Sequence, residues 1–105
     1  MSGIDYEFDW DDAKAASNLT KHGVDFWQAM TVLVDPLAMT FFDAEHSQDE
    51  ERWVSVGRAS VDAHTLLVVV HTFVATGPSS ALVRIISARA ATRHERQQYE
   101  QGTLQ

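Results

Sequence analysis

The sequence predicts one α+β domain over residues 1–105, with two N-terminal helices, a four-stranded antiparallel sheet and a short C-terminal helix. Three observations favour this fold class. Apolar residues recur at helical spacing in the first half, and four short apolar segments separated by polar loops follow in the second. A last, polar segment starts with a helix-capping pattern. The length of 105 residues is typical of one domain with a single core.

Two helices are expected in the first half. The first begins between residues 10 and 12, capped by Asp9 or Asp11, and ends before Gly23. Its apolar positions are Trp10, Ala13, Ala16 and Leu19. The second begins at Asp25, where Gln28 completes a capping-box-like pattern, and ends at the Asp35-Pro36 pair because proline disfavours helical geometry in the residue before it.

Four strands and a final helix are expected in the second half. The strands cover residues 37–42, 52–58, 66–73 and 82–88, and their short connections favour an antiparallel meander. Residues 43–51 form an acidic loop, and residues 74–81 are expected to be the mobile end of a hairpin. The last helix begins at Thr92, whose capping box includes Glu95, and stops near Gly102. Beyond Tyr99 it has almost no apolar face, which is typical of a solvated helix or of one held by a partner.

Charge is distributed unevenly along the chain. Residues 1–51 carry 12 acids and 2 bases, a formal charge of −10, whereas residues 52–105 carry 3 acids and 6 bases, a formal charge of +3. This asymmetry favours a localised anion site, although the arginines could simply offset carboxylates. The absence of cysteine excludes disulfides and thiol catalysis. No segment resembles a secretory signal or a membrane span, so we expect a cytoplasmic protein without membrane contact.

Arginines are the strongest candidates for a functional site. Arg84 and Arg89 enclose the last apolar segment, and Arg52 begins the second. Arginine recognises phosphate through paired charged hydrogen bonds. In a regular strand Arg84 and Arg89 point to opposite faces, so either Arg89 has left the strand or the two do different jobs. Glu51 could orient Arg52, although a simple ion pair explains the two equally well.

Other polar residues have competing interpretations. Lys21 and His22 could bind phosphate and transfer a proton, or they could be cations placed favourably at a helix C-terminus. His71, in an apolar segment, is more often a satisfied half-buried residue than a catalyst. His46 lies among the acids Asp43, Glu45, Asp49 and Glu50, but the loop has no glycine for the sharp turn of a calcium site, so we expect a solvated charge run, no metal and no cofactor.

Seven segments in order resemble the BrnT family of bacterial type II toxins. They are Phe8-Asp9-Trp10-Asp11, Lys21-His22-Gly23, Asp35-Pro36, Glu50-Glu51-Arg52, Gly57, residues 84–89, and Glu95-Arg96 with Tyr99. The resemblance implies a RelE-like fold, RNA cleavage that inhibits translation, and neutralisation by a ribbon-helix-helix antitoxin of the BrnA type. It further implies that the toxin–antitoxin complex binds operator DNA. Carried over by position, it implies a catalytic set of Lys21, His22, Glu51, Arg52, Arg84 and Arg89.

These inferences predict metal-independent RNA cleavage, in which the ribose 2′-hydroxyl attacks the adjacent phosphorus. Arg52 and Arg84 would stabilise charge on the phosphoryl oxygens, and Lys21 and Arg89 would position the backbone. His22, His71 and Glu51 are all candidates for proton transfer, and the sequence does not choose among them. Two alternatives are a non-catalytic module that docks an acidic or DNA-binding partner and, less favoured, a metal hydrolase that uses the acidic loop.

Overall fold

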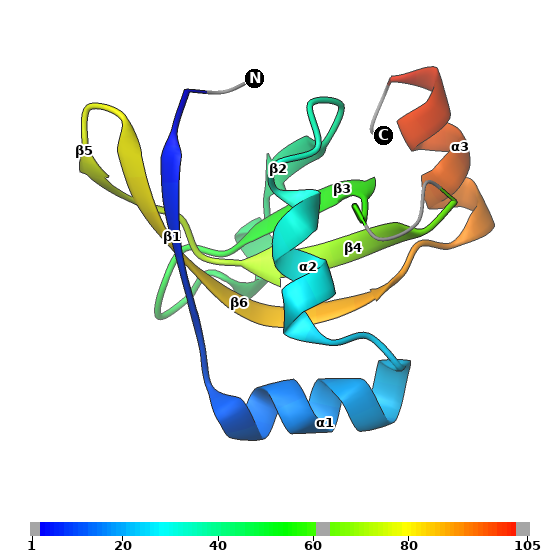
Figure 1. Ribbon diagram of the computed structural model, residues 1–105, viewed down its shortest axis with the longest axis horizontal. Helices are drawn as coiled ribbons and strands as arrows, with labels where there is room; N and C mark the ends of the chain where they lie inside the picture. Colours follow the sequence, from blue (N-terminus) through cyan, green and yellow to red (C-terminus); the bar gives the residue numbers. More distant parts are fainter. Residues whose placement is uncertain (1–2, 61–63, 103–105) are drawn as a thin grey trace.

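The computed structural model describes residues 3–60 and 64–102 and contains three α-helices and six strands (Figure 1). Within these residues no helix is long and apolar enough to cross a membrane. In chain order the elements are β1 (Asp5–Trp10), α1 (Asp12–His22), α2 (Phe26–Val32), β2 (Met39–Phe42), the 3-10 turn η1 (Ala44–His46), β3 (Trp53–Arg58), β4 (Leu66–His71), β5 (Val74–Gly77), β6 (Ser80–Ala90) and α3 (Arg93–Gln101).

The α+β class is confirmed, but the four-stranded antiparallel sheet is wrong. The six strands form a mixed sheet with the order β1-β6-β4-β3-β2, and β5 pairs separately with β6. β1 runs parallel to β6, and the other neighbours are antiparallel. The parallel pairing joins residues 5–10 to residues 80–85, so the N-terminal segment completes the sheet beside the C-terminal strand (Figure 1).

β1 was absent from the sequence prediction, which placed Trp10 in the first helix. In the structure Trp10 ends the strand, Asp11 caps the helix by accepting a hydrogen bond from the Lys14 amide at 3.1 Å, and α1 starts at Asp12. The segment Asp-Tyr-Glu-Phe-Asp-Trp alternates strictly between acids and aromatics, and its burial alternates in step. This period of two is the signal of a half-buried strand.

Residues 74–81 also differ from the prediction. They were expected to be the mobile end of a hairpin, but they form a paired hairpin of their own, in which Val74–Gly77 is β5 and pairs with the start of β6. β6 is correspondingly longer than expected, with 11 residues from Ser80 to Ala90. The side chains of β5 are all exposed, so the apolar burial that identifies most strands is missing here.

The predicted helix caps are confirmed. Gly23 follows α1 with a φ of 69°, in the left-handed region that glycine adopts without steric cost. Asp25 caps α2 by accepting a hydrogen bond from the Gln28 amide at 2.7 Å, and α2 ends at Val32, just before the Asp35-Pro36 pair. Thr92 and Glu95 form the expected capping box of α3.

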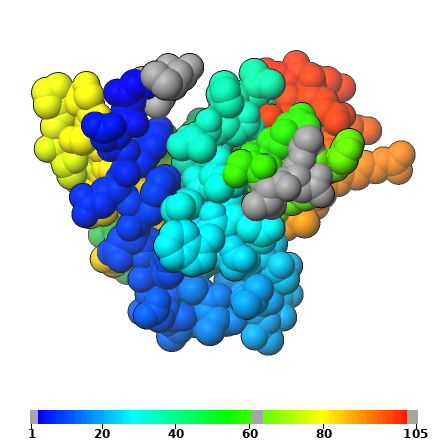
Figure 2. Space-filling model, in the orientation of Figure 1, coloured from blue at the N-terminus to red at the C-terminus, as the bar shows by residue number. Residues whose placement is uncertain are grey.

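The helices cover the two faces of the sheet unequally. One core packs α2 with Leu67, Val69, Ile85 and Ala88, and Ala15 of α1 and Trp10 of β1 lie against it. A smaller core on the other face packs Tyr99 of α3 with Val56, Leu66 and Val68. α3 therefore covers only one end of that face. We call the remainder, with Phe41, Val54, Val70 and Arg84, the open face; Figure 2 shows the opposite, helix-covered side.

Beyond the last residue of β6 that pairs with β1, a buried side-chain amide takes the place of a neighbouring strand as hydrogen-bond partner. The side chain of Asn18 in α1 accepts a hydrogen bond from the Ala88 amide at 3.0 Å and donates to the Ala88 carbonyl at 2.8 Å. It also donates to the Val24 carbonyl at 2.9 Å. Asn18 is 5% exposed, so these bonds satisfy backbone groups that water does not reach.

Asp35 joins three elements at the end of β3. Its carboxylate accepts hydrogen bonds from the Arg58 amide at 2.8 Å and from the Tyr99 hydroxyl at 2.6 Å. Burial alone would raise the pKa of Asp35, but these bonds and one from the Leu37 amide lower it overall. Gly57 allows Asp35 to lie this close to β3, because a Cβ at that position would lie 2.9 Å from Val32 Cγ1 and 3.2 Å from Asp35 Oδ2.

Candidate active site

A β-bulge brings Arg84 and Arg89 to the same face of the sheet. The register pairs Val70 with Ser87 but His71 with Ile85, so one residue of β6 is skipped between the two pairs. Arg84 then lies opposite Asp9, and Arg89 opposite Val68. In β6 each arginine is next to a residue that points into the helix-covered core. Because adjacent residues of a strand point to opposite faces, both arginines lie on the other face. The expectation of opposite faces applied to a regular strand, and the bulge makes β6 irregular while Arg89 stays within it.

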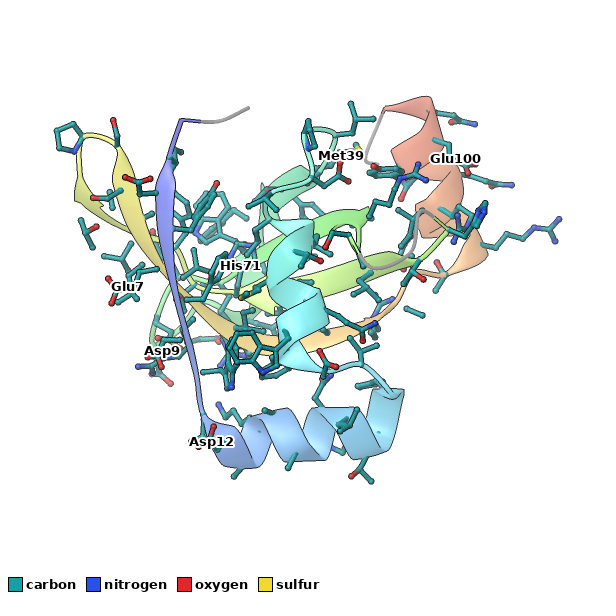
Figure 3. All side chains as sticks on the ribbon, viewed as in Figure 1. Glu7, Asp9, Asp12, Met39, His71 and Glu100 are labelled. Atoms are coloured by element: carbon teal, nitrogen blue, oxygen red, sulfur yellow. The ribbon has the colours of Figure 1, made fainter. Side chains whose placement is uncertain are left out.

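Arg84 lies in a polar row that runs from β1 across β6 to the residues next to the ends of β4 and β3. Its guanidinium is 3.5 Å from the Asp9 carboxylate of β1, and Figure 3 labels Asp9 beside the end of that strand. On its other side the Thr72 amide donates to the Arg84 carbonyl at 2.9 Å, and the Arg84 amide donates to Thr72 Oγ1 at 3.0 Å. The register that pairs Trp53 with His71 places Arg52 beside Thr72. Sequence reasoning had not identified Asp9 or Thr72 as members of the site.

Glu51 and Arg84 line the same shallow pocket, which has a volume of about 250 Å³. It is lined by Glu50, Glu51, Thr72, Phe73, Val74, Leu82 and Arg84. Two of the predicted catalytic residues, Glu51 and Arg84, therefore contribute to one pocket although 33 positions separate them in the chain. The side chain of Arg84 is 55% exposed, so its donors remain accessible to a ligand. Arg52 is less exposed, and its buried Nε has no hydrogen-bond partner among the described residues.

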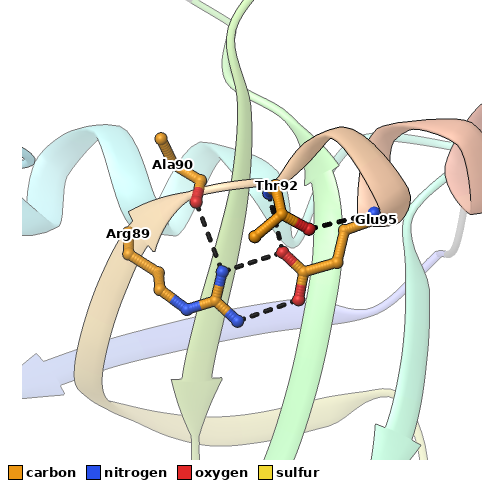
Figure 4. A network of polar contacts seen from close by, with 4 residues as sticks. All are labelled: Arg89, Ala90, Thr92 and Glu95. Carbon is orange, nitrogen blue, oxygen red and sulfur yellow. Dashed lines mark hydrogen bonds and ion pairs between the residues drawn. The ribbon is translucent and has the colours of Figure 1, made fainter.

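Arg89 is engaged by a carboxylate in the same chain. Its two terminal nitrogens donate to the two oxygens of Glu95, each at 2.8 Å, and the Thr92 amide donates to the same carboxylate (Figure 4). The hydrogen bonds from Arg89 and the Thr92 amide hold the pKa of Glu95 at about 2, below its ordinary value of 4.5, although burial opposes them. The ion pair of Arg89 thus holds the start of α3 against β6.

The Arg89–Glu95 pair is expected to contribute stability that depends on pH. Because the folded protein holds the pKa of Glu95 below its unfolded value, the contribution is complete above pH 4.5 and is lost as the pH falls toward 2. We therefore expect Glu95→Gln to lower the free energy of unfolding more at neutral pH than near pH 2. Urea unfolding at several pH values measures this difference. A destabilisation that is independent of pH would contradict it.

Lys21 and His22 lie apart from the arginines. They form the last turn of α1, on the helix-covered side, and both are exposed. Among the described residues no hydrogen bond or ion pair connects either of them to Arg52, Arg84 or Arg89. Their position at a helix C-terminus matches the favourable placement of cations there. Their catalytic role remains a prediction.

His71 is buried and fully hydrogen-bonded. It is 1% exposed, and Figure 3 labels it inside the molecule. Its Nδ1 donates to the Thr72 carbonyl at 2.9 Å, so its Nε2, 2.7 Å from Ser55 Oγ, accepts from that hydroxyl when the ring is neutral. Burial lowers the pKa of His71 and favours this neutral form. His71 therefore does not reach a substrate on the open face.

A larger cavity lies away from the candidate catalytic residues. It measures about 780 Å³ and opens between β1 and the α2–β2 segment, where Figure 2 shows a notch. Its lining includes Ile4, Tyr6, Leu33 and Thr40, but none of the predicted site residues. Within residues 3–60 and 64–102, no three His, Asp or Glu side chains gather as a metal site requires.

Comparisons with known proteins identify the family. The family model described as the ribonuclease toxin BrnT of type II toxin–antitoxin systems matches residues 10–95. The crystal structure of the ribonuclease toxin BrnT from Brucella abortus is similar, with a TM-score of 0.58, 24% sequence identity, and coverage of 86% of this chain and 100% of that chain. At this identity the likeness shows the fold alone, and no curated protein sequence matches. Because the family model spans most of the chain, the protein belongs to the BrnT family of type II toxins.

Proposed function

We propose that this protein is a RelE-like, metal-independent endoribonuclease that acts in the cytoplasm and inhibits translation. The observation that carries the proposal is the pocket on the open face that both Glu51 and Arg84 line. Arg84 and the neighbouring Arg52 bind the oxygens of the phosphodiester and stabilise the negative charge that builds on them during attack. Membership of the BrnT family supports RNA as the substrate.

The reaction begins at the ribose 2′-hydroxyl. Glu51 accepts its proton, the 2′-oxygen attacks the adjacent phosphorus, and the bond to the 5′-oxygen breaks. Glu51 is favoured over His71 because His71 is buried, and over His22 because His22 lies at the end of α1. Thr72 fixes the Arg84 backbone through two hydrogen bonds, one from its amide and one to its hydroxyl, and Arg89 holds α3 at the border of the open face.

The charge of the chain limits its affinity for RNA. The 12 acids of residues 1–51 repel phosphates, and Asp9 lies directly beside Arg84. We therefore propose weak binding of free RNA. A ribbon-helix-helix antitoxin of the BrnA type neutralises the protein, and the complex of the two binds operator DNA through the antitoxin. A small ribbon-helix-helix reading frame beside the gene would support this assignment.

Purified protein incubated with RNA in EDTA tests the proposal. We expect fragments that carry 2′,3′-cyclic phosphate and 5′-hydroxyl ends, and no cleavage of the same sequence made of DNA, which lacks the 2′-hydroxyl. Loss of cleavage in EDTA, or equal cleavage of DNA, would contradict the mechanism.

The alternative of a non-catalytic docking module was based on the polar last helix. The inner side of that helix is already engaged, because Tyr99 is buried in the core beneath it and donates to Asp35, whereas its outer residues are exposed. Intact RNA in the assay above, together with a stable partner complex, would nevertheless favour the alternative.

A further inference from the structure

A histidine–aspartate pair lies in the connection between β2 and β3. Nδ1 of His46, at the end of η1, is 2.9 Å from Oδ2 of Asp43. The side chain of Asp43 is 18% exposed, whereas that of His46 is 66% exposed. The carboxylate is thus largely covered, while most of the imidazole reaches solvent. Sequence reasoning had assigned both residues to a solvated charge run.

Backbone hydrogen bonds attach this pair to Arg52. The Asp43 amide donates to the Arg52 carbonyl at 2.8 Å, which extends the β2–β3 register by one residue. Ser47 closes the turn, because its hydroxyl donates to the Asp43 carbonyl at 2.5 Å and accepts from the Arg52 amide at 3.0 Å. Asp43 therefore lies beside Arg52, at the end of the row that contains Thr72 and Arg84. Glu50 and Glu51 of the same connection line the pocket.

The geometry fixes how His46 can transfer a proton. An ionised carboxylate only accepts hydrogen bonds, so Nδ1 of His46 carries a hydrogen and donates it to Asp43. This contact orients the ring, and no hydrogen bond engages Nε2 within the part of the chain that the structure describes, so this nitrogen can face a substrate, as in other histidine–aspartate pairs. The arrangement differs from that of His71, in which both ring nitrogens are engaged inside the protein.

We propose that His46 is the general acid of the RNA cleavage reaction and that Asp43 is its positioning residue; this inference rests on the proposed function. Glu51 takes the proton of the 2′-hydroxyl, and the 2′-oxygen forms a bond to phosphorus. As the bond from phosphorus to the 5′-oxygen breaks, the leaving oxygen takes the proton from Nε2 of His46. The products are a 2′,3′-cyclic phosphate, a 5′-hydroxyl and a neutral imidazole, so one base and one acid balance the reaction.

The test uses two substrates that differ in the leaving atom. With ordinary RNA in EDTA, His46→Ala is expected to lower the cleavage rate by about 10²–10⁴-fold, the usual contribution of a general acid. With RNA whose leaving 5′-oxygen is replaced by sulfur, the variant is expected to match the parent protein, because a thiolate is a better leaving group and departs without a proton. His94→Ala is the matched control, since it removes an exposed histidine from α3.

Asp43→Asn and Glu51→Gln complete the experiment. Asp43→Asn is expected to lose rate on ordinary RNA and to recover on the sulfur substrate, which a merely structural defect would not allow. Glu51→Gln is expected to stay slow on both substrates. An unchanged rate for His46→Ala, or an equal loss on both substrates, would overturn the assignment. If the parent protein cuts neither substrate, the proposed function itself fails.

Discussion

Replacing Arg84 with alanine is expected to slow RNA cleavage by about 10²–10³-fold, the usual cost of removing one well-placed donor to developing charge. Arg84 is the predicted arginine whose exposed guanidinium lines the same pocket as Glu51. Arg84→Lys is expected to recover only part of the rate, because an ammonium group cannot make the paired hydrogen bonds of a guanidinium. Initial rates on one RNA, measured in EDTA, compare the variants.

Arg93→Ala provides the control for Arg84→Ala. It removes one positive charge from an exposed position on α3 and therefore changes the net charge equally. We expect it to retain close to the parent rate. If both variants were slowed alike, the effect of Arg84 would be one of overall charge. If neither were slowed, Arg84 would have no part in catalysis.

Asn18→Ala is expected to lower the free energy of unfolding by roughly 3–5 kcal/mol, because each buried polar group left without a partner costs about 1–3 kcal/mol. The substitution leaves the amide and carbonyl of Ala88 and the carbonyl of Val24 without their side-chain partner. The loss is large against the total stability of a small domain, about 5–15 kcal/mol. Urea unfolding at neutral pH measures it.

Two further substitutions test whether the loss of stability comes from the amide of Asn18. Ser17→Ala changes an exposed residue of the same helix and is expected to alter stability by no more than about 0.5 kcal/mol. Asn18→Asp keeps the acceptor for the Ala88 amide but loses both donors and buries a charge, so it is expected to be at least as harmful as alanine. A nearly neutral Asn18→Ala would show that water replaces the amide.

Local signals in the sequence predicted the helix ends well. Gly23, Asp25 and the Thr92–Glu95 pair act within one turn of the chain, so their effect depends little on distant residues. The missed strands are of a different kind. β1 carries acids on every second residue, and its place is decided by residues more than 70 positions away. β5 buries no side chain, so composition alone gave no signal for it.

The candidate site was predictable in part. The residue types were informative, and the structure places Glu51 and Arg84 in one pocket. The shared face of Arg84 and Arg89 was not predictable, because it depends on the bulge opposite Val70 and His71. The partner of Arg89 also escaped prediction, since Glu95 was assigned to the helix cap alone. It serves both purposes, accepting from the Thr92 amide and from Arg89.

The parallel pairing of β1 with β6 has a consequence for synthesis of the protein. Residues 5–10 are made well before their partners, residues 80–85, so this pair of strands cannot form until the chain between them has been synthesised. Arg84 itself belongs to that late segment. Under the proposed function, a nascent chain therefore has neither its finished sheet nor the cation of its site until this late segment has been made.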